Sequence, residues 1–238
     1  MLSSGCLDRD SHEVDELEGA NQMLEDKLIG DIVSLLKLVD AVRTKYLVED
    51  LLGSDVVVLL LLESPHSHEI SSPEIHCRYP AAGDTGLAIS MNLLEGIDEP
   101  IGKYINEDLN KQKFGIMNCC QLPMQKSAYT SPALSQDLLD AFKTIRNTKI
   151  NVVKRQKSDT QLVDDKIYEN FKKRLSNFLE DNNNIKLVVP CGKMAEYFLN
   201  KYEALDKIEI FPLPHPARNN WSRAKNSIKE LKKKIQSI

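Results

Sequence analysis

The sequence predicts an α/β protein, a three-layer α/β/α sandwich with a central parallel sheet of about four strands. Two observations lead to this fold class. Apolar segments of strand length alternate with segments of helical periodicity through most of the 238 residues. The run from Val56 to Leu62 is continuously apolar and opens with three β-branched residues, which is typical of a strand buried on both faces of a parallel sheet. Crossover connections between such strands place helices on both faces of one sheet.

An acidic segment precedes this first strand. Residues 11–49 carry apolar side chains at helical spacing, and the first fifty residues hold twelve acids against five bases. We therefore assign residues 1–50 to an acidic helical extension and residues 51–238 to the α/β domain. The extension is expected either to mask a basic face of the domain or to form a dimer contact, and the sequence leaves the oligomeric state open.

The elements of the domain follow in alternation. After the first strand we expect a long proline-containing loop at 64–85, helices at 86–94 and 101–110, a strand at 113–119 and a polar loop at 121–131. The second half should contain helices at 134–145 and 162–179, a strand at 185–189, a helix at 192–202, a strand at 207–213 and a final helix at 222–235. The asparagine run at 182–184 should end the second of these helices.

Three predicted strands end on polar residues suited to chemistry. Glu63 follows the first strand, Asn118 ends the second, and His215 follows the last. Ligands of parallel α/β sheets bind outside the carboxyl ends of the strands. The sequence therefore predicts that these three residues, far apart along the chain, meet at one site.

The net charge of −4 conceals a strongly uneven distribution of charged residues along the chain. Residues 143–157 hold six bases and no acid, and residues 218–234 hold seven bases against Glu230 alone. Local basic fields bind phosphate backbones even on an acidic protein. The alternative is that these lysines and arginines form ordinary solvated helix faces.

Composition excludes several classes. Apolar residues at 42% and charged residues at 28% fit a globular domain and not a disordered or fibrous chain. The longest apolar run spans seven residues, too few for a membrane span, and the first residues lack the basic and apolar regions of a secretory signal. Five cysteines without a CxxC pair indicate reduced thiols. We expect a cytoplasmic protein without membrane association, metal or cofactor.

A metal site in the long loop is the alternative to this expectation. Two of its histidines alternate, and the loop holds further residues of ligand type; the candidate ligands are His66, His68, Glu69, His76 and Cys77. Ser64 is not expected to be a nucleophile, because the flanking positions Leu62 and His66 lack the glycines of a nucleophile elbow.

Several motifs resemble those of the uracil-DNA glycosylase superfamily. In the segment 62–69, Glu63, Pro65 and Glu69 match the first motif of the branch with the sequence Gly-Glu-Ala-Pro-Gly, while Leu62 and His66 replace its two glycines. Segment 80–86 is similar to the proline and paired-glycine element of that branch, and segment 86–90 to its counterpart in another branch. The strand at 115–118, the segment 188–195 and the His-Pro loop at 215–218 resemble later family elements in the same order.

The resemblance implies a DNA glycosylase, a hydrolase of N-glycosyl bonds that removes uracil or another deaminated or damaged base in base-excision repair. DNA carrying such a base is the implied partner, and no cofactor is implied, since the cluster cysteines of the nearest branch have no counterparts here. The implied catalytic residues are Glu63 and His215, those for base recognition are Asn118, Pro65 and His66, and those for DNA binding are Ser64, Pro216, Arg218, Asn219 and Trp221.

The chemistry suits these residue types. Cleavage of an N-glycosidic bond builds positive charge on the sugar, which the carboxylate of Glu63 offsets while it positions water. Negative charge gathers on the departing base, and His215 stabilises it if its proton faces the site. The amide of Asn118 carries a donor and an acceptor that read the paired edge of a pyrimidine.

Each residue also has a structural interpretation. Glu63 would cap a turn or pair with Arg78, Asn118 would be a satisfied strand-end amide, His215 would lie on a rigid turn between two prolines, and Trp221 would be a core residue. One departure from the family bears on function: the aromatic that stacks on the base is absent. Alignment places Ala81 or Ile89 there, with Tyr79 or Phe114 as substitutes. A nucleic-acid or nucleotide binder of the same fold without catalysis is therefore the alternative function.

Overall fold

The computed structural model describes residues 45–238, except 73, 75–76, 110–111, 130–135, 148–157, 203–204, 206–207 and 218–219. The chain divides into two compact units, Met1–Thr44 and Lys45–Ile238. The predicted acidic helices fall almost entirely outside the described residues. The second unit begins at Lys45, and Tyr46 and Val48 are buried in it.

A single parallel sheet forms the centre of the described unit. Its strands are β1 (Val58–Leu62), β2 (Phe114–Asn118), β3 (Leu187–Pro190) and β4 (Glu209–Ile210), in the order β2-β1-β3-β4. All pairings between them are parallel. The predicted fold class and the four predicted strands are confirmed.

The fourth strand is shorter than predicted. Only Glu209 and Ile210 form β4, against the range 207–213 expected from the sequence, and both residues are exposed. A separate parallel bridge joins Cys191 to Leu213 beyond it. An edge strand pairs on one side only, so its apolar sequence does not guarantee a continuous ladder.

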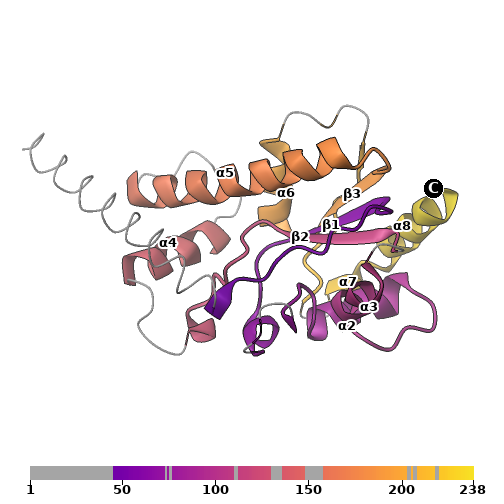
Figure 1. Ribbon diagram of the computed structural model, residues 1–238, viewed down its shortest axis with the longest axis horizontal. Coiled ribbons are helices and arrows are strands. Elements are labelled where there is room, and N and C mark those ends of the chain that lie inside the picture. The colour runs from indigo at the N-terminus through magenta and orange to yellow at the C-terminus, as the bar shows by residue number, and fades with distance from the viewer. Residues whose placement is uncertain are drawn as a thin grey trace, which may run out of the picture. The chain divides into compact units, whose positions relative to one another are not determined.

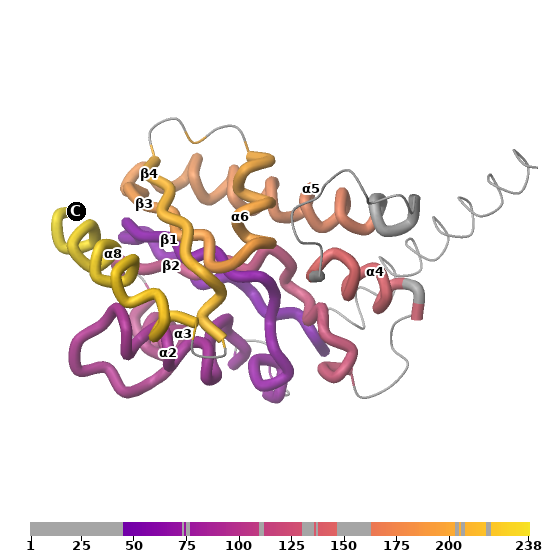
Figure 2. The backbone as a smooth tube through the Cα atoms, turned by 180° about the vertical axis from the view of Figure 1, so that it is seen from behind, coloured from indigo at the N-terminus to yellow at the C-terminus, as the bar shows by residue number. Residues whose placement is uncertain are grey.

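Helices cover both faces of the sheet. Those on one face are α2 (Asp84–Leu93), α3 (Ile101–Glu107), α7 (Asn220–Arg223) and α8 (Lys225–Ser237), and those on the other are α5 (Ser158–Asp181) and α6 (Lys193–Asn200) (Figure 1; Figure 2). The remaining helix, α4 (Gln136–Asn147), packs against α5. Two short 3-10 helices, η1 (Ser67–Ile70) and η4 (Lys126–Ala128), interrupt the predicted loops. No described helix has the length and apolar character of a membrane span.

Alternation along β1 explains the two layers. Val58, Leu60 and Leu62 belong to one apolar cluster together with residues of α2, α3 and α8. Leu59 and Leu61 point to the opposite face because successive side chains of a strand alternate, and both are fully buried. Because helices cover both faces of the sheet, β1 must be apolar at every position, as we predicted from the sequence.

The order of the strands creates a switch point. From β1 the chain moves outward to β2, and from β3 it moves outward to β4 on the other side. The direction of winding therefore reverses between the neighbours β1 and β3. In open α/β sheets the crevice outside the carboxyl ends of such strands is where ligands bind.

The segment before β1 covers the outer edge of β2. Leu51 forms an antiparallel bridge with Ile116, and the Val48 N–H donates to the Gln121 carbonyl at 3.1 Å. Asp50 is thereby brought beside Asn118 at the carboxyl end of β2. Residues 45–50, which composition alone assigns to the acidic extension, are part of the α/β unit.

Candidate functional site

Glu63 lies at the carboxyl end of β1, beside the end of β2. The Cys119 N–H donates to the Leu62 carbonyl at 2.8 Å, and the Cys120 N–H donates to the Glu63 carbonyl at 3.0 Å. The Glu63 carboxylate accepts a hydrogen bond from Nε of Arg146 on α4. The Glu63 side chain is 18% exposed and that of Arg146 is 32% exposed, so this ion pair is partly accessible to solvent.

The sequence suggested a different partner for Glu63. Arg78 is buried, and its Nε donates to the Ser72 carbonyl at 2.6 Å. The carboxylate instead contacts Arg146, a residue counted in the sequence only as part of a basic stretch. Sequence periodicity gives no sign that this arginine reaches the end of β1, because the contact depends on how α4 packs.

Asn118 has an unusual environment at the end of β2. It is 1% exposed, and both atoms of its side-chain amide are buried with no hydrogen-bond partner among the described residues. Its backbone N–H donates to Oδ1 of Asp50 at 3.1 Å. Burying an unpaired amide costs about 1–3 kcal/mol, and such groups in native structures call for an explanation. The described residues therefore supply no partner for the amide that the structural interpretation of Asn118 takes to be satisfied.

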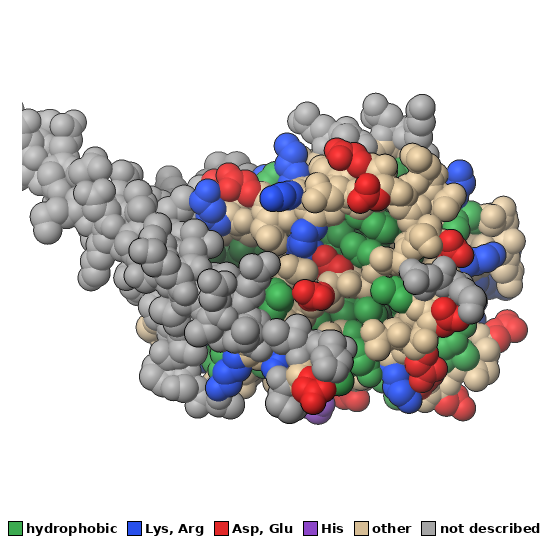
Figure 3. Space-filling model, viewed as in Figure 1, with side chains coloured by type: hydrophobic (Ala, Val, Ile, Leu, Met, Phe, Trp, Pro, Cys, Tyr) green, Lys and Arg blue, Asp and Glu red, His purple; other side chains and the backbone are tan. Residues whose placement is uncertain are grey.

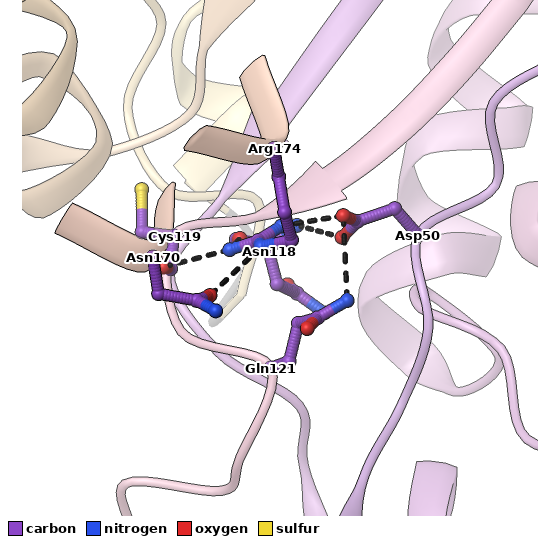
Figure 4. Close-up of polar contacts among 6 residues, drawn as sticks. All are labelled: Asp50, Asn118, Cys119, Gln121, Asn170 and Arg174. Carbon is purple, nitrogen blue, oxygen red and sulfur yellow. Dashed lines mark hydrogen bonds and ion pairs between the residues drawn. The ribbon is translucent and has the colours of Figure 1, made fainter. Parts of the chain in front are cut away.

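A buried ion pair is hydrogen-bonded to the backbone of Asn118 (Figure 4). Arg174 on α5 pairs with Asp50 and donates from Nη2 to the carbonyls of Asn118 at 2.8 Å and Cys119 at 3.1 Å. Two neighbours complete the cluster: Arg174 Nε donates to Asn170 Oδ1 at 2.9 Å, and Gln121 Nε2 donates to Asp50 Oδ2 at 3.4 Å.

Burial dominates the electrostatics of this cluster. It raises the pKa of Asp50, and the neighbouring Arg174 guanidinium opposes that rise. The side chain of Asp50 is only 6% exposed and that of Arg174 16% exposed. Neither residue stands out in the sequence, because Asp50 lies among many acids, Arg174 lies within an amphipathic helix, and 124 positions separate them.

The loop after β1 carries the other residues of the first motif. Ser64 Oγ is buried without a hydrogen-bond partner among the described atoms, and Pro65 is buried beside it. His66 is exposed, and its ring lies 5.6 Å from that of His68 between centroids. Partial burial lowers the pKa of His66, and the charges of His68 and Arg146 lower it further.

Glu69 holds this loop to the next one. Its carboxylate accepts hydrogen bonds from the backbone N–H groups of His66 at 2.9 Å and of Ala81 and Ala82. It is 8% exposed, and burial raises the pKa of Glu69 to about 7. The carboxylate of Glu69 is thus hydrogen-bonded to backbone N–H groups.

No cluster of three potential metal ligands occurs among the described residues. His76, one candidate ligand in the long loop, lies outside them.

His215 has a defined tautomer. The Ala217 N–H can only donate, and it lies 3.1 Å from Nδ1 of His215. Nδ1 is therefore the acceptor, which places the proton of the neutral ring on Nε2. This tautomer carries the ring proton that the proposed role of His215 requires.

The loop around His215 is held from two sides. Asn220 Nδ2 donates to the His215 carbonyl at 3.0 Å, and Trp221 Nε1 donates to the Pro214 carbonyl at 2.7 Å. On the other side lies Gly192, the residue before α6, with φ of +103°. A Cβ atom on Gly192 would come within 3.0 Å of the Cβ of His215, so glycine is what lets the loop approach β3.

The remaining predicted DNA contacts have different positions. Trp221 is 1% exposed and belongs to the apolar core cluster, so the assignment of its indole to a surface wedge is wrong in this structure. Pro216 is also buried. Arg218 and Asn219 lie outside the described residues.

The structure shows where the candidate replacements for the stacking aromatic lie. Phe114 begins β2, about 13 Å along the strand from Asn118, so it lies at the wrong end of the sheet to substitute. Ala81 and Ile89 are fully buried, and Tyr79 packs against the core cluster. The loop after β2 contains a further aromatic residue, Tyr129. Its side chain is half-buried, and its ring centroid lies 4.7 Å from that of Tyr46.

The structure brings the three predicted strand-end residues to one edge. Leu62 pairs with Asn118, which puts Glu63 next to the end of β2. His215 lies against Gly192 at the end of β3, the other neighbour of β1. At about 4.8 Å per strand, the backbones of Glu63 and His215 are roughly 10 Å apart across the switch point.

The basic fields of the sequence are only partly described. On α8 the apolar Ile228 and Leu231 are buried, whereas Lys225, Lys229 and Lys233 are exposed. On the face shown in Figure 3, the described lysines and arginines are interspersed with acids and do not form a field of one sign. Most of the 143–157 stretch lies outside the described residues.

Comparison with known proteins gives little beyond the fold. No family model matches the chain, and no curated protein matches it. Among solved structures, it is similar to the solution NMR structure of a "putative Uracil DNA glycosylase" from Methanosarcina acetivorans, with 13% sequence identity and a TM-score of 0.46. The match covers 79% of this chain and 94% of the other.

Proposed function

We propose that the carboxyl edge of the sheet is a base-excision site and that the protein is a DNA glycosylase, which hydrolyses the N-glycosidic bond of uracil or another deaminated or damaged base. The observation that carries the proposal is the amide of Asn118. Its donor and its acceptor are both buried and unpaired within the described structure, at the strand end where the motif resemblance expects base recognition. A base edge with one donor and one acceptor would satisfy both.

The proposed catalytic groups lie at the same edge of the sheet as that amide, Glu63 after the neighbouring strand β1 and His215 beyond the end of β3. Glu63 is the residue next to the β2 end, and an ionised carboxylate there offsets the positive charge that develops on the sugar and orients the attacking water. His215 carries its proton on Nε2. A donor at this position stabilises negative charge on a carbonyl oxygen of the leaving base without a full proton transfer.

Pro65 and His66 are proposed to border the base, and Ser64 and Pro216 to contact the DNA backbone next to it. Arg218 and Asn219, which follow Pro216, are proposed to contact the duplex. DNA is the proposed partner, and its flipped nucleotide would enter between the ends of β1 and β3. The reaction is a hydrolysis that needs no cofactor, since the chain's own carboxylate and imidazole supply the charges that the transition state requires.

One observation favours the second candidate, a nucleic-acid or nucleotide binder without catalysis. The Glu63 carboxylate is paired with Arg146, so its charge is partly neutralised where an enzyme would need it free to face a cationic sugar. In a binder, Arg146 would contact a phosphate in place of that carboxylate. Stacking on an aromatic side chain also remains without an assigned residue.

Single-turnover base release separates the two candidates. Oligonucleotides holding uracil, hypoxanthine, xanthine or a methylated base are incubated with excess protein, and the free base is quantified. The wild-type protein, Glu63→Gln and His215→Ala are compared, with Glu74→Gln as a control on an exposed carboxylate in the same loop.

A glycosylase releases one of these bases, and both catalytic variants slow that release by at least about a hundredfold, the typical contribution of one positioned catalytic group. Folded protein that binds the oligonucleotides with salt-dependent affinity but releases no base would establish the binder instead.

A further inference from the structure

The buried pair of Asp50 and Arg174 is hydrogen-bonded to three backbone polar groups at the end of β2. Asp50 accepts from the N–H of Asn118, and Arg174 donates to the carbonyls of Asn118 and Cys119. The backbone of Asn118 is therefore fully hydrogen-bonded, whereas its buried side-chain amide has no partner among the described residues.

Stability alone does not account for this arrangement. Desolvation of two charges offsets much of their attraction, and replacing a buried ion pair by apolar residues is often neutral or stabilising. Arg174 also does more than pair with Asp50, because Nη1 of its planar guanidinium contacts Asp50 while Nη2 donates to two successive carbonyls. Asn170 and Gln121 further restrain the two charged groups.

We infer that Asp50 and Arg174 are positioning residues for Asn118: they fix the end of β2 so that the amide is held in one orientation toward its ligand. The inference rests on the proposed function for the identity of that ligand, a nucleobase edge. Neither residue touches the base. A hydrogen-bonding group selects one ligand only when its orientation is fixed, because a loosely held amide can pair with the edges of several different bases.

The test uses a charge-neutral double variant, Asp50→Asn with Arg174→Met, because a single substitution would leave one buried charge uncompensated. The matched control is Asp164→Asn with Lys201→Met, which removes another ion pair involving α5, with Nζ and Oδ2 3.8 Å apart and the Asp164 side chain fully buried. Asp164 lies about 15 Å along α5 from Arg174. Both variants are studied in the full chain at a temperature where each is folded.

The first readout does not depend on activity. The side-chain NH₂ signal of Asn118 is assigned by its loss in Asn118→Asp, and its order parameter is measured by ¹⁵N relaxation. We expect a value near 0.85, as in rigid backbone, for the wild type and the control, and a value below about 0.6 for the Asp50/Arg174 variant. Arg174→Lys keeps the charge but not the planar guanidinium, so its order parameter should lie between these values.

The second readout is selectivity. The ratio of kcat/KM for the excised base over thymine should fall at least about tenfold in the Asp50/Arg174 variant, as expected for one misplaced hydrogen bond, and stay unchanged in the control. An unchanged Asn118 order parameter in the folded Asp50/Arg174 variant would overturn the positioning role, whatever the activity. If the wild type releases no base, the proposed function fails while the order parameter still decides the inference.

Discussion

At the scale of single residues, the most informative feature is a contrast between satisfied and unsatisfied groups. Glu69 has three backbone donors for its carboxylate, and the backbone of Asn118 is fully bonded. The Asn118 amide and the Ser64 hydroxyl, by comparison, are buried without partners among the described atoms. Folding does not leave polar groups unpaired without cost, and these two lie at the carboxyl edge of the sheet, where we propose that a ligand binds.

Glu69 predicts a pH dependence of stability. Its pKa is raised to about 7 in the folded protein from 4.5, so the folded state binds the proton more tightly than the unfolded chain. The resulting stabilisation is complete below about pH 4.5 and is lost as the pH rises through 7, by up to about 1.4 kcal/mol per pH unit within that window.

Glu69→Gln keeps an acceptor oxygen for the backbone N–H groups and removes the titration. Denaturant unfolding at pH 5 and pH 8 should show that the wild type loses more free energy of unfolding between the two values than the variant does. Equal losses in the two proteins would show that Glu69 titrates normally.

Gly192 predicts a second residue effect. In Gly192→Ala the new Cβ approaches the Cβ of His215 to 3.0 Å and the backbone must keep a φ of +103°, so we expect lower stability and a displaced imidazole. Gly96→Ala is a matched control, because Gly96 has a φ of +75° and nothing within 4 Å of the new Cβ. Strain alone would lower stability in both variants. Slower base release in Gly192→Ala only would tie the glycine to His215.

At the scale of elements, the packing of α2 and α3 shapes the loop that Glu69 holds. Gly86 on α2 lies directly against this loop, since a Cβ there would come within 1.7 Å of the Ala81 carbonyl oxygen. The same carbonyl accepts the N–H of Gly102 on α3 at 3.2 Å. The loop backbone is therefore closely packed between two helices at positions where only glycine fits.

Gly86→Ala should accordingly destabilise the fold by several kcal/mol, because neither the helix nor the loop can move by more than an ångström without losing these contacts. Gly83→Ala is the control, since its Cβ would meet only the His68 Cβ at an ordinary 3.7 Å. Thermal unfolding of both proteins measures the difference. Equal midpoints would mean that the helices adjust freely.

The sequence predicts elements better than it predicts contacts between them. Continuous apolar runs with β-branched residues identified β1, β2 and β3 because such runs have few other uses in a chain of this composition. The predicted range of β4 was too long, because its residues lie on an edge and pair over only two positions. Glu63, Asn118 and His215 could be placed at one edge of the sheet from the sequence because each lies at or shortly after the end of a predicted strand. Arg146, Asp50 and Arg174 were missed because their roles arise from helix packing, which periodicity does not encode.

At the scale of the whole molecule, the boundary between the two units matters. The acidic composition runs to Asp50, but the compact unit begins at Lys45. Tyr46 and Val48 are buried, and Asp50 anchors the end of β2. Composition alone therefore places the boundary several residues too late for a truncation experiment.

We expect residues 45–238 to unfold cooperatively with nearly the stability of the full chain. Residues 51–238 should lose several kcal/mol, since this fragment removes two buried apolar side chains and leaves the charge of Arg174 without Asp50. Urea unfolding of the two fragments checks this. Equal stability of both would show that residues 45–50 contribute nothing to the fold.

The measurement that tests the central claim most directly is base release by Asn118→Ala under single-turnover conditions, compared with the wild type and with Asn92→Ala, whose amide bonds only within its own helix. If the unpaired amide reads the base, loss of its two hydrogen bonds should slow release about ten- to hundredfold, while Asn92→Ala matches the wild type. Release from Asn118→Ala at the wild-type rate would contradict the account, because the group that identifies the site would then have no part in its function.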